Sequence, residues 1–380
     1  MAEMESIGEL CQLINGYAFK SSDWSSEGIP IVRIQNLNNI LGKFNYFKGK
    51  LDKKYYIDNG ALLFSWSGTP GTSFGAFIWN RGPAIINQHI FRVIPKKRIN
   101  IFYLKYALNG KLSDIIAKSH GGVGLQHITK KDFEKINISV PSLDVQNKIV
   151  MTLNSLEDIL EKRKQQLSKL DQLIKSRFIE MFGDPIRNEK NWPVVSLGEV
   201  AEIYIGPFGT LLHKEDYIYG SHALINPSHI LEGKIYPDKS FTISEEKYIE
   251  LKSYHLQKGD IVLGRRGEMG RCAVVEYPGL ICGTGSMIIR PYKNMKPYFI
   301  QNIISSPGYK KYIEDKAVGG TMLNLNVRIV SEIKIPLLPI NMQEKFINFL
   351  HQIDNSKLTV KQSLEKLETL KKSLMQEYFG

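Results

Sequence analysis

The sequence predicts an α+β protein, made of two similar mixed α/β globules separated by two long antiparallel helices that form a coiled coil. Three observations predict this pseudo-twofold internal repeat. The phrase "KQQLSKLDQLIKSRFIEMFG" ends at Gly183, and "KQSLEKLETLKKSLMQEYFG" ends at Gly380. Apolar residues in both phrases recur at helical spacing. A chain of 380 residues is also long for a single core, so at least two domains are expected.

The repeat extends well beyond the two phrases. Residues 146–183 align with residues 343–380 without a gap when shifted by 197 positions. Upstream, "GGVGLQHITKKDFEKINISVPSLDVQ" aligns with "GGTMLNLNVRIVSEIKIPLLPINMQ". Each passage contains a short β-type run that ends at a proline, Pro141 or Pro339, and a helix follows. Asp144 and Asn341 are the residues that we expect to cap these helices.

The starts of the two globules also correspond. "SIGELCQLINGYAF" from Ser6 resembles "SLGEVAEIYIGPFG" from Ser196, and "GALLFSWSGTPGTS" from Gly60 resembles "GDIVLGRRGEMGRC" from Gly259. The predicted division is therefore a first domain at 1–143, a central helix at 144–183, a linker at 184–190, a second domain at 191–340 and a terminal helix at 341–380. The helices are more alike than the globules, which indicates a shared scaffold with diverged functional surfaces.

Both predicted helices carry an apolar seam with steps of mostly three and four residues. The seam positions of the first helix are Ile149, Leu153, Leu156, Leu160, Leu167, Leu170, Ile174 and Met181, with one break at Arg163. Those of the second are Phe346, Leu350, Ile353, Val360, Leu364, Leu367, Leu374 and Tyr378, with breaks at Lys357 and Lys371. Two such helices most simply bury their seams against each other, within one chain or between two chains. The outward faces, with Lys162, Lys164, Lys169, Lys366 and Lys371, would then remain available to partners or DNA phosphates.

The charge balance favours a polyanionic partner. The net charge is +12 and the isoelectric point is about 9.3, and Lys and Arg can neutralise phosphates. The chain has no apolar run long enough to span a membrane and no secretory signal, so we expect a cytoplasmic protein. Its three cysteines, Cys11, Cys272 and Cys282, form no metal-binding pattern and no disulfide framework, so no metal site is expected.

Two similar globules on a helical spacer suit a bipartite site on double-stranded DNA. Side chains with paired donors and acceptors are the ones that distinguish bases, and several glycine-rich or polar stretches supply them. The candidate DNA-binding residues of the first globule are Arg33, Gln35, Asn36, Ser67, Thr69, Asn87, Gln88, His89 and Arg92. Those of the second are Asn226, Ser228, His229, Arg265, Arg266, Arg271, Thr284 and Ser286.

Motifs for catalysis are weak or absent, so we expect no catalytic residues. There is no phosphate-binding G-x-x-x-x-G-K-[ST] loop, and the Gly264–Gly270 glycines have the wrong spacing for a dinucleotide fingerprint. Two alternatives stay open. One is a self-contained metal-dependent nuclease that uses Pro237, Asp238 and the 245–247 segment. The other is a coiled-coil adaptor that binds proteins and no DNA.

The sequence resembles the specificity subunits of type I restriction-modification systems. The resemblance rests on the "INQHIFRV" phrase, the two Gly-Gly…Pro…Gln-x-Lys passages and the helices that end in "MFGDP" and "YFG". It implies two target recognition domains, each of which binds half of an asymmetric, interrupted DNA sequence. It also implies modification (methyltransferase) subunits, of which we expect two, and restriction (translocase and nuclease) subunits as partners. S-adenosylmethionine, ATP and magnesium would belong to those partners, so no cofactor is expected on this chain.

Overall fold

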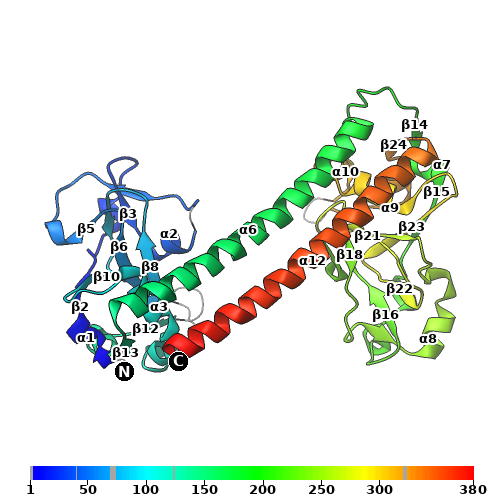
Figure 1. Cartoon of the computed structure of the whole chain (residues 1–380). Helices are drawn as coiled ribbons and strands as arrows, with labels where there is room; N and C mark the ends of the chain where they lie inside the picture. Colours follow the sequence, from blue (N-terminus) through cyan, green and yellow to red (C-terminus); the bar gives the residue numbers. More distant parts are fainter. Residues whose placement is uncertain (1–2, 40, 69–73, 123–124, 320–322) are drawn as a thin grey trace. The chain divides into compact units, whose positions relative to one another are not determined.

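The computed structural model describes residues 3–39, 41–68, 74–122, 125–319 and 323–380 (Figure 1). The chain divides into two compact units. Unit 1 comprises Met1–Gln166 and Val360–Gly380, and unit 2 comprises Leu167–Thr359. The division falls within the two long helices, so each unit combines one α/β globule with a part of each helix.

Unit 1 is built around a four-stranded antiparallel sheet. Its strand order is β2 (Cys11–Asn15), β10 (Ile90–Pro95), β6 (Ala61–Ser65), β8 (Gly75–Trp79). The central strand β6 is buried on both faces, with Leu63 and Phe64 fully inaccessible, which fits its unbroken apolar sequence. Helix α3 (Ile101–Gly110) packs against β8.

Unit 2 repeats this sheet with the same strand order. It consists of β15 (Ala201–Ile205), β23 (Ser286–Pro291), β20 (Ile261–Gly264) and β21 (Cys272–Val274). Helix α9 (Pro297–Ile304) packs against β21, as α3 packs against β8. The predicted internal repeat is therefore confirmed at the level of topology.

A second, smaller sheet also recurs. In unit 1 it has the order β4 (Asn45–Phe47), β3 (Ile29–Val32), β9 (Ala84–Ile86), β5 (Tyr56–Ile57), and in unit 2 the order β19 (Thr242–Ile243), β16 (His222–Ile225), β22 (Leu280–Cys282). The pairs β3–β9 and β16–β22 are parallel.

The first residues of each globule are fixed by the same local chemistry. Strand β1 (Glu3–Ser6) pairs with β13 (Asn137–Val140), and β14 (Val194–Ser196) pairs with β24 (Lys334–Pro336). Ser6 and Glu9 form a capping box on α1 (Ile7–Leu10), and Ser196 and Glu199 form one on α7 (Leu197–Val200). Shorter elements complete the two units. In unit 1 they include α2 (Ile34–Asn38), β7 (Ser67–Gly68), α4 (Leu112–Ala117), β11 (His120–Gly122), β12 (Leu125–His127) and α5 (Lys130–Glu134). In unit 2 they include β17 (Ile230–Leu231), β18 (Lys234–Ile235), α8 (Glu245–Glu250), α10 (Pro307–Lys316) and α11 (Val327–Ser331).

The two long helices are α6 (Leu143–Phe182) and α12 (Ile340–Phe379), each of 40 residues. Both begin one residue before the positions expected to cap them, so Asp144 and Asn341 lie in the first turn and the cap prediction was wrong. In α6 the carbonyl of Ser142 accepts the Gln146 N–H, which starts the helix directly after Pro141.

Within each unit α6 and α12 run antiparallel, and both helices come from the same chain (Figure 1). The predicted seam positions Leu156, Leu160 and Val360 are buried in unit 1, and Leu350 and Ile353 are buried in unit 2. The predicted fold class, with its antiparallel coiled coil and internal repeat, is confirmed.

The two seam breaks of α12 are ion-paired to α6. Lys371 Nζ lies 2.7 Å from Glu157 Oε1 in unit 1, and Lys357 Nζ lies 2.5 Å from Asp171 Oδ1 in unit 2. Lys357 and Lys371 lie two heptads apart on α12, and their partners Asp171 and Glu157 lie two heptads apart on α6. Both ion pairs therefore belong to one antiparallel register. Lys371 therefore faces the other helix, and its placement on the outward surface was wrong.

The start of each long helix is anchored by a buried glutamine. Gln146 Oε1 accepts from the backbone N–H of Asn100, and its Nε2 donates to the carbonyl of Pro141. Gln343 does the same with Lys296 and Leu338. Both glutamines are at most 1% exposed, and both bind the residue that caps the adjacent helix, α3 or α9. These contacts explain why the glutamine occurs at the same place in both copies of the repeat.

The Phe-Gly endings anchor the other end of each helix. Phe182 of α6 packs among Phe299 and Phe346 in the core of unit 2. Phe379 of α12 packs against Tyr103 in the core of unit 1. Each helix therefore begins in the core of one unit and ends in the core of the other.

Candidate DNA interface

Three distant chain segments meet at one end of the main sheet in unit 1. They are the end of β3 (residues 32–33), the residues after β6 (66–67) and the turn between β9 and β10 (87–89). The Trp66 N–H donates to the carbonyl of His89 at 3.2 Å, and the Asn87 N–H donates to the carbonyl of Val32 at 3.0 Å. The Trp66 carbonyl in turn accepts from Ile128 N–H at 3.1 Å.

Unit 2 contains the same backbone network. Arg265 N–H donates to Gly285 at 3.0 Å, and Gly283 N–H donates to Ile225 at 3.0 Å. The Arg265 carbonyl accepts from Leu325 N–H at 2.9 Å. We call this arrangement the strand-end frame. It consists of residues 32–33, 66–67 and 87–89 in unit 1, and of residues 225–226, 265–266 and 283–285 in unit 2.

The frame brings together nine of the seventeen predicted residues. They are Arg33, Ser67, Asn87, Gln88 and His89 in unit 1, and Asn226, Arg265, Arg266 and Thr284 in unit 2. At matched positions the side chains differ: Trp66 corresponds to Arg265, Ser67 to Arg266 and Gln88 to Thr284. A common backbone thus presents two different chemical surfaces.

Trp66 is a prominent side chain of the frame in unit 1, and the sequence reasoning did not select it. Its indole Nε1 donates to Asn15 Oδ1 at 3.1 Å, and its ring centroid lies 5.4 Å from that of His89. An aromatic residue inside a glycine-rich polar stretch is the signal that could have found it, since such rings offer apolar contact to bases.

The turn at 87–89 holds two buried polar atoms whose hydrogen-bonding capacity is unused. Among the described residues, neither Gln88 Oε1 nor His89 Nδ1 has a hydrogen-bond partner. Burial lowers the pKa of His89, and the nearby positive charge of Arg33 lowers it further. His89 is therefore a neutral imidazole near pH 7, able to donate from one ring nitrogen and accept at the other.

In unit 2 the frame is dominated by two adjacent arginines. Arg265 Nε donates to Asn324 Oδ1 at 3.1 Å, which fixes the direction of the guanidinium. Arg266 is exposed. Burial lowers the pKa of Arg265, and the positive charge of Arg266 contributes to that shift.

The third arginine of this loop has a structural role. Arg271 donates to Glu268 Oε2 at 2.6 Å and to the carbonyl of Pro227 at 3.2 Å. Glu268 also accepts from Lys310 of α10. Hydrogen bonds from Lys310 and Arg271 lower the pKa of Glu268 to about 2. Glu268 therefore links the 265–271 loop to α10.

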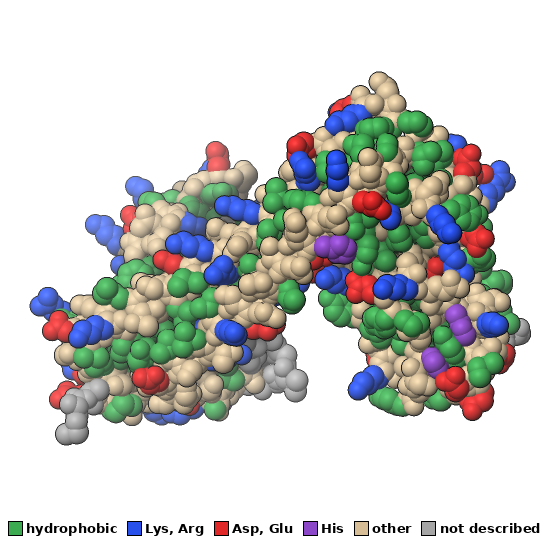
Figure 2. Space-filling view, turned by 45° about the vertical axis from the view of Figure 1, so that its right-hand side comes forward, with side chains coloured by type: hydrophobic (Ala, Val, Ile, Leu, Met, Phe, Trp, Pro, Cys, Tyr) green, Lys and Arg blue, Asp and Glu red, His purple; other side chains and the backbone are tan. Residues whose placement is uncertain are grey.

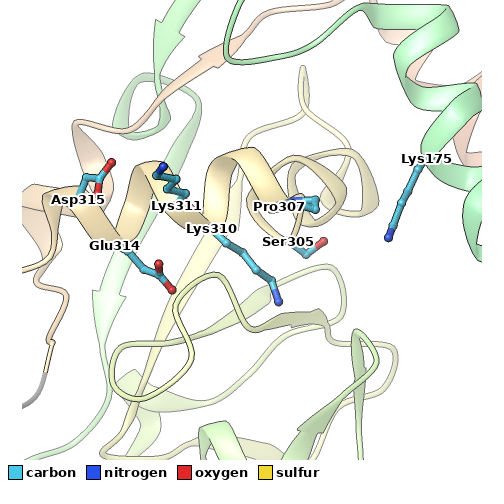
Figure 3. Close-up of a pocket in the computed structure, with 7 residues that line it drawn as sticks. All are labelled: Lys175, Ser305, Pro307, Lys310, Lys311, Glu314 and Asp315. Atoms are coloured by element: carbon cyan, nitrogen blue, oxygen red, sulfur yellow. The ribbon is translucent and has the colours of Figure 1, made fainter. Parts of the chain in front are cut away.

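Lys310 also lines a hollow between α6 and α10 in unit 2. The lining residues are Lys175, Ser305, Pro307, Lys310, Lys311, Glu314 and Asp315 (Figure 3). Lys175 of α6 and Lys310 of α10 extend toward the space between the two helices, and Glu314 and Asp315 lie on α10 beside the lysines (Figure 3).

Several other predicted residues use their polar groups inside the fold. Asn36 Oδ1 accepts from the Arg33 N–H at 3.0 Å, and its Nδ2 donates to Lys43. His229 Nδ1 occupies the matching position in unit 2, 3.2 Å from the Asn226 N atom. Arg92 donates to the carbonyl of Tyr56 at 3.0 Å. Asn36, His229, Ser67 and Ser286 are all buried, so a base contact by any of them would require local opening.

The remaining predicted residues lie beside the frame or outside the described part of the chain. Gln35 and Ser228 are exposed on the helical turns that follow β3 and β16. Thr69 lies outside the described residues. Figure 2 shows Lys and Arg side chains spread over the visible face and mixed with acidic ones, so charge on that face does not mark one site.

The model of the type I restriction modification DNA specificity domain matches this chain twice, at residues 2–170 and 189–369. The chain belongs to the type I restriction-modification specificity family. It is a DNA specificity subunit with two recognition domains, and the resemblance noted from the sequence is confirmed. Neither alternative, a self-contained nuclease or an adaptor that binds no DNA, is supported.

Two relatives within the specificity family are distant in sequence but cover 85% or more of this chain. The type I restriction enzyme EcoBI specificity subunit of Escherichia coli is 22% identical and covers 98% of this chain and 84% of its own length. The MjaVIII specificity subunit of Methanocaldococcus jannaschii is 23% identical and covers 85% and 79%.

Solved structures of type I specificity subunits share the fold. The S subunit from M. genitalium aligns over 100% of this chain and 96% of its own, with a TM-score of 0.59 and 16% identity. A chain from a study of complex assembly and conformational transition of the type I restriction-modification system aligns over 100% and 97%, with a TM-score of 0.63 and 17% identity. At this identity the likeness shows the fold, and no base contact is transferred.

The residues of the nuclease alternative have other partners in unit 2. Lys247 donates to both carboxylate oxygens of Glu250, and Asp238 accepts from the N–H and hydroxyl of Ser240. The described residues include no group of three or more His, Cys, Asp or Glu side chains placed to hold a metal ion. No described helix is long and apolar enough to cross a membrane.

Proposed function

We propose that this specificity subunit recognises an asymmetric, interrupted sequence in double-stranded DNA, with one half-site bound by each domain. The observation that carries the proposal is the strand-end frame. The same backbone hydrogen bonds occur in both units, while the side chains at matched positions differ. A shared scaffold with different side chains is what two dissimilar half-sites of one target require.

We further propose that the subunit supplies specificity without catalysis of its own. Base contacts would come from the exposed or partly exposed residues of the frame, with Gln35 and Ser228 beside it. The net charge of +12 supports contacts to the phosphate backbone. S-adenosylmethionine, ATP and magnesium would be bound by the partner subunits, and no residue of this chain is assigned to them.

The partners are modification and restriction subunits, and we propose two modification subunits. Leu173 and Leu370 occupy equivalent positions of the repeat, and both are exposed, at 46% and 48%. An exposed leucine in each copy supports one equivalent contact per unit. A complex that acts on chromosomal DNA would place the subunit in the cytoplasm.

The test is to purify the chain alone and together with its modification subunit, and to map the bases that each preparation methylates. We expect methylation only with the partner, at a bipartite motif with a fixed gap. Replacing residues 1–140 with those of another specificity subunit should change one half-site only. Methylation by the isolated chain, or a change in both half-sites, would contradict the proposal.

A further inference from the structure

The loop that follows β20 in unit 2 carries three arginines, and they differ in how far the fold uses them. Arg271 is fully engaged by Glu268 and Pro227. Toward the described residues, the side chain of Arg265 donates only from its Nε, to Asn324. The side chain of Arg266 makes no hydrogen bond or ion pair with any described residue, and it is exposed.

Among the described residues, no carboxylate forms an ion pair with Arg265 or Arg266. Glu268, the acidic residue of the loop, is already held by Arg271 and Lys310. Gly267 and Gly270 adopt left-handed φ angles of 79° and 73°, which set the path of the loop around that ion-pair network. Two neighbouring positive charges without a counter-charge repel each other, and acceptors from a bound ligand would relieve this repulsion.

The backbone of Arg265 and Arg266 is held in place by neighbouring segments of unit 2. Arg265 is tied through its backbone to Gly285 and Leu325, and Arg266 forms a β-bridge with Asn324. The two guanidinium groups are therefore presented from a fixed backbone, beside the turn at 283–285. A fixed backbone lowers the entropy cost of aligning a guanidinium, a planar group with paired N–H donors, with a single binding partner.

Unit 1 provides the contrast. At the same two frame positions it carries Trp66 and Ser67, and Ser67 is buried at 8% exposure. The backbone hydrogen bonds are conserved, so the exchange of Trp-Ser for Arg-Arg is a chemical difference on a common scaffold. It points to different base preferences at matched positions of the two half-sites.

We propose that the Arg265–Arg266 pair recognises guanine in the half-site bound by the second domain. The inference rests on the proposed function. An arginine fork donates two hydrogen bonds to O6 and N7 of guanine, an arrangement that no other base offers in the major groove. The half-site of the first domain has no arginine-read guanine at the matched position, because Trp66 and Ser67 cannot supply such a fork.

The test uses Arg266→Lys in the complex with the modification subunit. Lysine keeps the charge and a phosphate contact, but loses the bidentate fork. The second half-site is first assigned by the swap of residues 1–140. Duplexes that differ only at guanines of that half-site are then compared for binding. We expect the preference for guanine to fall at one position by about tenfold or more.

Arg328→Lys is the matched control, since Arg328 is an exposed arginine of α11 in the same unit, 86% exposed. It should leave every preference unchanged. Thermal unfolding of both variants checks that the fold is intact. An Arg266→Ala variant distinguishes the two kinds of contact, because loss of a phosphate contact weakens all duplexes alike and reduces the salt dependence.

Three outcomes would overturn the inference: a second half-site without guanine, an unchanged guanine preference in Arg266→Lys, or uniform weakening in Arg266→Ala with all preferences retained. Failure of the proposed function looks different. In that case the wild-type complex itself would bind no specific duplex, and no preference could be measured for any variant.

Discussion

Lys371 of α12 donates a hydrogen bond from Nζ to Oε1 of Glu157 on α6, at 2.7 Å. Glu157 also accepts from the Tyr106 hydroxyl at 2.8 Å and from Lys105 at 3.2 Å. Burial alone would raise the pKa of Glu157, but the bonds and charges of Lys371 and Lys105 outweigh it, so the pKa lies below its usual value. One carboxylate thus joins both long helices to α3 within unit 1.

We predict that Glu157→Gln destabilises unit 1 by about 1 kcal/mol at neutral pH, a modest value because both side chains are about a third exposed. Because the pKa of Glu157 is lower in the folded state, its carboxylate stabilises the folded protein above about pH 4.3, which is the pKa of glutamate in the unfolded chain. This stabilisation is lost as the pH falls through the pKa of the folded state. The difference between wild type and variant in denaturant unfolding should therefore shrink below about pH 4.

Asp158→Asn is the control, since this neighbouring carboxylate is exposed on α6. It should change stability little at any pH. A Glu157→Gln difference that persisted unchanged at pH 3 would show that packing, and not the charge of Glu157, accounts for the effect.

The buried glutamines give a second prediction. Gln146→Ala removes an acceptor for the Asn100 N–H and a donor to Pro141, and it leaves buried backbone groups unpaired. We expect a loss of about 1–3 kcal/mol, and a similar loss for Gln343→Ala in unit 2. Gln172→Ala, at an exposed position of α6, is the control and should be nearly neutral. Equal unfolding midpoints for Gln146→Ala and Gln172→Ala would contradict the assigned role.

The Phe-Gly ending of the chain gives a third prediction. Phe379 is 4% exposed and packs against Tyr103, and its Cβ lies so close to Gly110 that a side chain at that glycine would collide with it. Phe379→Ala should destabilise unit 1 by about 3–5 kcal/mol. Tyr378→Ala, at the half-buried neighbouring position, should cost less. A Phe379→Ala variant as stable as the wild type would show that the helix end is not anchored there.

The helices were the most predictable part of the molecule, because a helix buries one face at a fixed period that the sequence displays directly. Their ion pairs were not predictable. Lys371 looked like an outward break in the seam, since its partner Glu157 lies 214 residues away and meets it only in one antiparallel register. Periodicity indicates which face is buried, but it does not identify what a charged residue on that face will meet.

The strand-end frame was only partly predictable for a similar reason. Glycine-rich and polar stretches pointed to the three segments, yet their meeting depends on β-pairing between strands far apart in sequence. Trp66 was not selected, because the prediction considered side chains with paired donors and acceptors. Asn36 and His229 were selected by residue type, although each is buried and accepts a hydrogen bond from a backbone N–H three residues earlier.

Exposed leucines give a fourth prediction, about partners. Leu173→Glu should weaken binding of one modification subunit, and Leu370→Glu should weaken binding of the other, because each places a charge in an apolar contact. The double variant should bind neither. Native mass spectrometry of the reconstituted complex would count the bound subunits. Leu41→Glu, at a leucine that is 91% exposed, is the control. Full occupancy in the double variant would place the contact elsewhere.

The turn at 87–89 gives a fifth prediction, which separates stability from recognition. Gln88 Oε1 and His89 Nδ1 lack partners among the described residues, so the folded protein gains little from either atom and bears the cost of desolvating it. Gln88→Ala and His89→Ala should therefore leave stability unchanged or slightly increased. Both should nevertheless relax the half-site of the first domain, because a base can no longer satisfy these atoms, and the half-site of the second domain should stay as it is.

Methylation mapping in cells that carry each variant measures both half-sites at once, and denaturant unfolding measures stability. Gln12→Ala, at an exposed glutamine of β2 in the same unit, should change neither. Lower stability with unchanged recognition would assign the turn to the fold alone. Relaxation of both half-sites would indicate a general loss of binding. Only the combination of retained stability and one relaxed half-site identifies Gln88 and His89 as residues held unpaired for the DNA.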